Sequence, residues 1–318
     1  MKQQILLLAL AGALIPSFVL NEQIPVVQAP KNVEIQIPLQ HGEFFDKLTI
    51  LMIKRERIHD AAKRKNIDKE YALLDAVYKT IKKTPELSEL MNNLLEANIA
   101  LWELEDLTRE KEARKECDDD EFIELVLKIV ENNDTRFAIK RAINTLLSST
   151  LVEEKSYIET LARDLETDMS HVKRSRYLDV VTIPISLGDL LDRISILEIK
   201  RERITDSEKL TNIRYEYKIL MEIYKENITP TPEIEELYQQ LLSFNKQMWD
   251  VQDGIRKHAI GNKLKTKGLK IADEETKKEL IRCGRGVYFS NDGRVRVKRE
   301  INMLCGSAIV DEKQYTQC

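Results

Sequence analysis

The chain contains the same pattern twice. Residues 37–60 and 183–206 are identical at 13 of 24 positions at a constant offset of 146. Residues 133–157 and 291–315 are identical at 13 of 25 positions at an offset of 158. Self-similarity on this scale predicts a tandem duplication, with two copies of one structural unit. A residue that both copies retain marks a position with a structural or functional role.

The length of 318 residues suits two domains, each long enough to bury its own core. We expect an apolar N-terminal segment, two helical repeats, a helical connector between them, and a basic loop insertion in the second repeat. The N-terminal segment is expected at residues 1–32 and the connector at 158–178. The two repeats are expected at 33–157 and 179–318, with the basic insertion near 261–270.

The composition is that of a helical protein. Only 10 Gly and 8 Pro occur in the chain, while charged residues make up 33% of it and the net charge is −4. A charge so close to balance indicates a salt-bridged surface and not the basic field of a nucleic-acid-binding protein, so we expect no nucleic-acid partner.

The pattern predicts an all-α fold of two repeated helical bundles. Each bundle has one short N-terminal strand, because apolar residues alternate at positions 33–39 and 181–185. Pro38 and Pro184 restrict these strands to an edge or a two-stranded pairing. Five helices per copy are expected, with Asn133 and Asp134 as the N-cap of the fifth. The long spine helices are expected at Glu86–Glu116 and Pro232–Ile260, each opening on a Thr-Pro-Glu start signal.

The N-terminus allows two interpretations. Residues 5–20 are apolar apart from Gly12, Pro16 and Ser17, a run that is short and interrupted for a membrane span of about 20 residues. It is either an export or anchoring signal or an apolar extension that packs on the fold. The helical repeats are expected in the cytoplasm, with membrane association or export if residues 1–20 act as a signal. Membrane contact is expected only through this segment.

Three predicted helices carry polar stripes that both copies retain. In the long helix the set is Asn98, Trp102 and Asp106, spaced i, i+4, i+8, so the three residues share one face. A cationic stripe with the same spacing begins at Arg136, and the first helix retains basic residues near its end. The candidate ligand-binding residues are Lys54, Arg57, Asn98, Trp102, Asp106, Arg136, Lys140 and Asn144 in the first copy, and Lys200, Arg203, Asn245, Trp249, Asp253, Arg294, Lys298 and Asn302 in the second.

These stripes leave three functions open. Arg and Lys side chains suit a phosphate or carboxylate, and Trp102 could stack on a ring. The first interpretation is therefore a binding or scaffolding module for an anionic, phosphorylated or sugar-linked small molecule. Alternatively, two acid-x-x-acid pairs could hold Mg²⁺ for hydrolysis of a phosphoanhydride. The candidate metal ligands are Glu43, Asp46, Glu103 and Asp106. In the third interpretation the stripes pair with one another, and the protein is a structural or interaction module.

No motif for another catalytic or metal-binding site is present in the sequence. The sequence has no GxSxG, GxGxxG, P-loop or HExxH motif, and its four His occupy no equivalent pair of positions in the two copies. The four Cys form no CxxC motif, so neither a zinc site nor a disulfide framework is expected.

Four motifs together resemble a known family. They are GEFFDKLTILMIKRERI, ALWELED, NDTRFAIKRAIN and LVEEKSY, and both copies carry versions of them. The combination is similar to a small bacterial domain family of unknown function whose members begin with a GELxDKLTILEIKxERI type of sequence and end with EEKSY. The resemblance implies a helical domain and no particular activity. The chain departs from that family in its tandem arrangement, its apolar N-terminus, His41 and Met52 in the first copy, and the loop insertion in the second.

Overall fold

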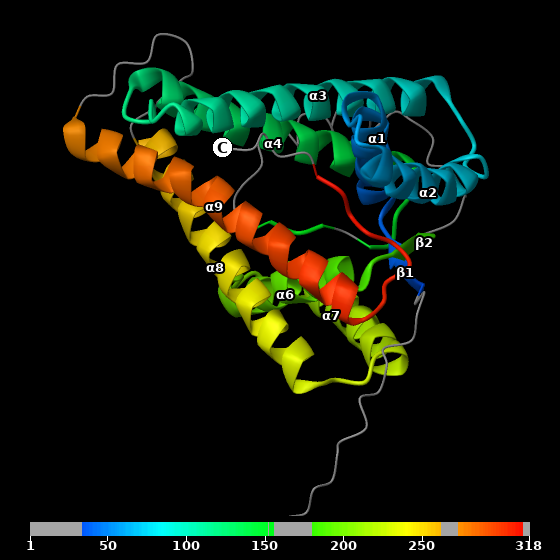
Figure 1. Cartoon of the computed structure of the whole chain (residues 1–318). Coiled ribbons are helices and arrows are strands. Elements are labelled where there is room, and N and C mark those ends of the chain that lie inside the picture. Colours follow the sequence, from blue (N-terminus) through cyan, green and yellow to red (C-terminus); the bar gives the residue numbers. More distant parts are fainter. Residues whose placement is uncertain (1–33, 152, 156–179, 262–272, 314–318) are drawn as a thin grey trace, which may run out of the picture.

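The computed structural model describes residues 34–151, 153–155, 180–261 and 273–313, and these are mostly helical (Figure 1). The predicted helical class is therefore confirmed. The expectations for the N-terminal segment, the connector and nearly all of the basic loop lie outside the described residues. Within the described part, no helix is both long enough and apolar enough to cross a bilayer.

Each half of the described chain contains one strand followed by four helices. We call residues 34–155 the first half and residues 180–313 the second half. The first half contains β1 (Ile35–Leu39), α1 (His41–Arg57), α2 (Ala61–Tyr78), α3 (Pro85–Ala113) and α4 (Asp120–Leu146). The second half contains β2 (Val181–Ile185), α6 (Leu187–Arg203), α7 (Ser207–Asn227), α8 (Pro232–Gly261) and α9 (Glu274–Leu304).

The start of each spine helix follows from a local signal. The Thr84 hydroxyl accepts a hydrogen bond from the Leu87 amide, and Pro85 occupies the first turn of α3. The same arrangement recurs in α8, where Thr231 accepts from the Ile234 amide. The predicted Thr-Pro helix starts are thus confirmed, and the ends of the spine helices differ from the prediction by one to three residues.

The prediction of five helices per copy is wrong, because the expected fourth and fifth helices are one continuous helix. Asn133 lies inside α4, where its side-chain amide donates to the Ile129 carbonyl at 3.0 Å, so it is not an N-cap. An Asn can bond the carbonyl four residues earlier and remain in a helix. The N-cap of α4 is Asp119, whose side chain accepts from the Phe122 amide. Asp273 has the same role for α9.

The two strands join the halves directly. β1 and β2 pair antiparallel, with Ile37 opposite Ile183. These two residues are equivalent positions in the internal repeat, so the pairing is symmetric about them. Each strand has one partner in this two-stranded sheet, which leaves an open edge where Pro38 and Pro184 are tolerated.

One apolar core crosses from half to half. The largest cluster of buried residues contains Phe44 and Leu94 of the first half together with Leu190, Leu241 and Ile301 of the second. Side chains of this size each contribute about 1.5–3 kcal/mol when fully buried. The shared cluster means that each half completes the core of the other.

The spine helices α3 and α8 each pack against the helix that follows, which gives two spine pairs, α3–α4 and α8–α9. These pairs meet near one end and diverge toward the sheet (Figure 1). The backbone of the pair α3–α4 approaches that of the pair α8–α9 mainly at α4. Two bidentate ion pairs join them: Arg109 binds Asp292 at 2.7 and 3.0 Å, and Arg256 binds Asp134 at 2.7 and 2.8 Å. The two pairs occupy equivalent positions of the repeat.

The segment after each last helix contacts the opposite half. Glu312, at the C-terminal end, accepts from Asn66 of α2 at 2.7 Å. Correspondingly, Glu154 of the first half accepts from Asn212 of α7 at 2.8 Å. In Figure 1 the red segment leaves α9 and runs toward α1 and α4. The halves therefore exchange their terminal segments, and each needs the other for its contacts.

Two glycines allow α1 and α6 to approach their neighbours closely. A Cβ on Gly42 would lie against the Lys140 carbonyl well inside van der Waals distance, and one on Gly188 would meet the Lys298 carbonyl. The amide of each glycine instead donates to an Asn side chain at 2.7 Å. Those acceptors are Asn144 and Asn302.

We predict that Gly42→Ala destabilises the protein by about 1–3 kcal/mol, because backbone atoms that cannot move aside obstruct the new methyl group. Helix propensity alone predicts the opposite, a gain of up to about 1 kcal/mol. Urea unfolding measures the difference, with Asn93→Ala on the exposed face of α3 as the control that should be neutral or slightly stabilising. A more stable Gly42→Ala variant would show that this contact is looser than described.

Candidate functional site

The retained acidic and cationic residues meet inside each half. Asp46 of α1 accepts two hydrogen bonds from the Arg136 guanidinium, at 2.8 and 3.0 Å. Asn98 of α3 donates to the same carboxylate at 3.0 Å and to the Thr49 hydroxyl. Asp46 is buried. Burial opposes its charge, but Arg136 and Lys140 outweigh that effect, and the pKa of Asp46 lies below its usual value.

The second half reproduces this group. Asp192 of α6 accepts from Arg294 at 2.6 and 3.1 Å, and Asn245 donates to Asp192 and to the Ser195 hydroxyl. Despite burial, Arg294 and Lys298 keep the pKa of Asp192 lowered. The stripes on three helices therefore face one another in both halves.

A second acidic–basic group lies at the start of the first helix of each half. Lys140 binds Glu43 and, at 2.7 Å, Glu153 of the terminal segment. Its counterpart Lys298 binds Asp189 at 2.7 Å and lies 3.5 Å from Asp311. Since Lys140 and Lys298 are each flanked by two carboxylates, both ammonium groups keep raised pKa values in spite of burial.

Ion pairs also cross between the halves near the sheet. Lys47 of α1 lies 3.2 Å from Asp189 of α6 and 2.7 Å from Glu70. The equivalent Arg193 of α6 lies 3.8 Å from Glu43 and 2.8 Å from Glu216. These contacts join the acidic–basic groups of the two halves into one network.

A cavity of about 320 Å³ lies beside this network, between α4 of the first half and helices α6, α8 and α9 of the second. Six cationic and two acidic residues line it, together with Asn, Gln and apolar side chains. The cationic residues are Arg136, Lys140, Lys155, Lys200, Arg256 and Arg294, and the acidic residues are Glu153 and Asp253. Both halves of the chain contribute to its wall.

Two further lysines of this cavity are in environments that differ from that of Lys140. The side-chain ammonium of Lys200 forms no hydrogen bond or ion pair with the described residues, although its charge, after that of Lys140, helps to lower the pKa of Glu153. Lys155 lies 4.1 Å from the centre of the Phe137 ring. Burial reduces the pKa of Lys155 to about 8, so its charge depends on pH near neutrality.

The equivalent lysine of the first half is in a different state. Lys54 is buried and its ammonium lies 2.5 Å from the Asp311 carboxylate. The position equivalent to Gln252 of the cavity is Glu105, an additional acid. The positions around Lys54 that are equivalent to the cavity lining therefore include one more acid than the lining itself.

Seven of the 16 predicted ligand-binding residues line the cavity, and the others have separate contacts. Lys54 pairs with Asp311, Lys298 with two carboxylates, and Asn98, Asn144 and Asn302 with neighbouring polar groups. Arg57 and Arg203 lie near the surface beside Trp102 and Trp249 and bind Glu103 and Asp250. The seven in the cavity are Arg136, Lys140, Lys200, Asn245, Trp249, Asp253 and Arg294.

The candidate metal ligands do not gather in one place. Glu43 and Asp46 contact Lys140 and Arg136, whereas Glu103 is largely exposed and binds Arg57. Burial raises the pKa of Asp106, with a hydrogen bond from Trp102 acting in the opposite direction. Among the described residues no three His, Cys, Asp or Glu side chains are grouped as metal ligands.

Three charged residues of the cavity were not among the predicted ligand-binding residues. Lys155 and Glu153 come from the terminal segment, and Arg256 comes from the end of α8. A signal for Lys155 and Arg256 exists, because both recur in the other copy, as Lys313 and Arg109. Their place in a shared cavity could not be predicted, because it depends on how the halves pack.

We predict that Asp311→Asn destabilises the protein at pH 7 by about 3 kcal/mol, because it removes a partner from the buried Lys54. Burial opposes ionisation of Asp311, but Lys54 and Lys298 hold its pKa well below the usual range. Because the pKa of Asp311 is lower in the folded protein than in the unfolded chain, its charge stabilises the fold at pH values above about 3.9. This stabilisation is lost as the pH falls below that value.

Urea unfolding at pH 7 and at lower pH measures this effect. The difference between the two proteins should shrink below about pH 4. Asp68→Asn is the control. Asp68 is about half exposed and pairs with Arg55 and Arg64, so its substitution should destabilise the protein by at most about 1 kcal/mol. Equal losses from both substitutions would contradict the proposed role of Asp311.

Comparison with known proteins gives one match. Residues 34–169 match the model of a family described as "Family of unknown function (DUF6165)", which covers less than half of the chain. This match agrees with the resemblance of the first copy to an uncharacterised domain family. No curated protein and no solved structure shows a significant match to the chain.

Proposed function

We propose that this protein binds an anionic small molecule, one that bears a phosphate or a carboxylate, in the cavity between its halves. The observation that supports the proposal is the charge of the cavity wall, with six cationic residues and two acidic ones around about 320 Å³. A space of this size is within the range of small-molecule sites.

The network behind the wall favours binding because it holds the cations in place. Asp192 fixes the Arg294 guanidinium through Nε and Nη2, which leaves Nη1 without a hydrogen bond among the described residues. Asp134 likewise fixes Arg256. A guanidinium that is already oriented loses less conformational entropy when an anion binds. The carboxylates thus position the cations while partly neutralising them.

Lys200 would supply an ammonium group that is not engaged in an ion pair with the described residues. It forms no ion pair within the described residues and lies in the wall with Arg294. Lys155 also lies in the wall, and a bound anion would favour its charged form, which burial disfavours. Trp249 would provide an apolar face for a sugar or base next to the charged group.

We further propose that the chain arose by tandem duplication and that the halves pack as a pseudo-symmetric pair. The internal identity and the equivalent ion pairs Arg109–Asp292 and Arg256–Asp134 support this origin. In this proposal the cavity forms where the two copies meet. In the equivalent place of the other copy, Lys54 is already paired with Asp311. Only the surroundings of Lys200 are therefore suited to an anion in this proposal.

A structural module remains the second candidate, and one observation favours it. Most retained charges are paired inside the protein, as Asp46 with Arg136 and Asp192 with Arg294. Such pairs can fix the register of helices. Hydrolysis of a phosphoanhydride is not favoured by the geometry, because Glu43 and Asp46 contact protein cations and Glu103 lies largely exposed.

We predict that Lys200→Gln weakens the binding of inorganic phosphate by about tenfold or more, since a hydrogen bond to a charged group contributes about 1.5–3 kcal/mol. Isothermal titration calorimetry measures the affinity, and urea unfolding should find the variant as stable as the parent. The matched control is Lys246→Gln on α8, which removes the same charge at the surface near Glu202. The proposal fails if the parent protein binds neither phosphate, sulfate nor a nucleotide, or if both variants bind phosphate equally.

A further inference from the structure

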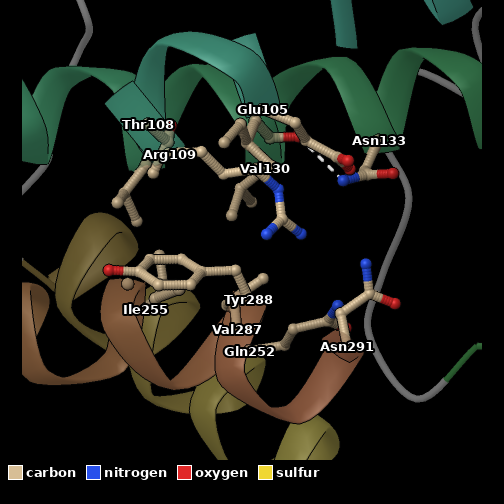
Figure 2. A pocket seen from close by; sticks show the side chains of 13 residues that line it. Glu105, Thr108, Arg109, Val130, Asn133, Gln252, Ile255, Val287, Tyr288 and Asn291 are labelled. Carbon is tan, nitrogen blue, oxygen red and sulfur yellow. Dashed lines mark hydrogen bonds between the residues drawn. The ribbon is translucent and has the colours of Figure 1, made fainter. Parts of the chain in front are cut away.

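A second, apolar cavity adjoins the cationic one. It has a volume of about 50 Å³ and lies between α3–α4 and α8–α9, where the spine pairs meet (Figure 2). Val130 and Ile255 lie on its two sides with Val287 and the Tyr288 ring. Two charged residues, Glu105 and Arg109, also line this cavity, and the guanidinium of Arg109 is paired with Asp292.

Three residues line both cavities: Val130, Asn133 and Gln252. Along α4 the lining changes from Val126 and Val130 to Arg136. On α8 it changes from Ile255 through Gln252 toward Trp249. On α9 it changes from Val287 through Asn291 to Arg294. Each of these helices therefore runs from the apolar cavity into the cationic one.

The spacing along α4 relates the two cavities. Six residues separate Val130 from Arg136, which is about 9 Å along a helix that rises 1.5 Å per residue. A molecule with its anionic group beside Arg136 and Lys200 could extend over Asn133 to Val130. The polar wall would contact its charged group and the apolar wall its other end.

We infer that the ligand of this site is an amphiphilic anion, with a phosphate or carboxylate group in the larger cavity and a short aliphatic group in the smaller one. This inference rests on the proposed function. An apolar cavity of ~150 Å³ holds a benzene ring. A volume of about 50 Å³ therefore suits a chain of a few carbons and excludes a long acyl chain or a ring.

Monoalkyl phosphates of increasing length test the inference by calorimetry with the full chain. Affinity should rise about fourfold for each methylene that enters the smaller cavity, since a buried methylene contributes about 0.8 kcal/mol. It should then stay constant as the chain is lengthened further, because the cavity ends. Inorganic phosphate serves as the reference without an aliphatic group.

Val287→Phe should abolish the dependence on chain length by filling the smaller cavity, while the affinity for inorganic phosphate stays unchanged. Val287→Leu, a smaller change, should shorten the rise and serves if the larger substitution impairs folding. The inference is overturned if alkyl phosphates bind no better than phosphate, or if the rise is the same in the Val287 variants. Failure to bind any phosphate would instead contradict the proposed function.

Discussion

The buried pair of a carboxylate on the first helix and a guanidinium on the last helix is the interaction on which the rest of the structure depends. Asp46–Arg136 ties α1 to α4, and Asp192–Arg294 ties α6 to α9. Removing such charges from water costs several kcal/mol per ion, which only well-placed partners offset. The Asn residues of α3 and α8 supply the additional hydrogen bonds. Three helices are thereby held in one relative position in each half.

This constraint connects the fold to the cavity. Arg136 and Arg294 both reach the cavity wall while their carboxylate partners lie behind them. The exchanged terminal segment brings Glu153 and Lys155 to the same wall. Because the wall takes residues from both halves, the site depends on their packing, and neither half contains all of it.

The sequence allowed the helical class, the strand positions and the spine starts to be predicted, because periodicity, Pro and Thr caps act locally. The predicted N-cap at Asn133 was wrong, because this side-chain amide, typical of a helix start, donates to the Ile129 carbonyl inside α4. The facing stripes on separate helices were predictable from their spacing. The exchange of the terminal segments and the asymmetry between Lys54 and Lys200 were not, because they depend on contacts between residues far apart in the sequence. Glu154 and Asn212 are 58 positions apart, and Lys54 and Asp311 are 257 positions apart.

A double-mutant cycle on Asp46 and Arg136 tests most directly whether these buried pairs organise the protein. Urea unfolding would compare Asp46→Ala, Arg136→Ala and the double variant with the parent protein. We expect each single substitution to cost about 3–5 kcal/mol, since it leaves a buried charge without its partner. The double variant should cost clearly less than the sum, with a coupling of about 2 kcal/mol or more. Additive losses, equal to the sum within about 0.5 kcal/mol, would contradict the central role of the pair.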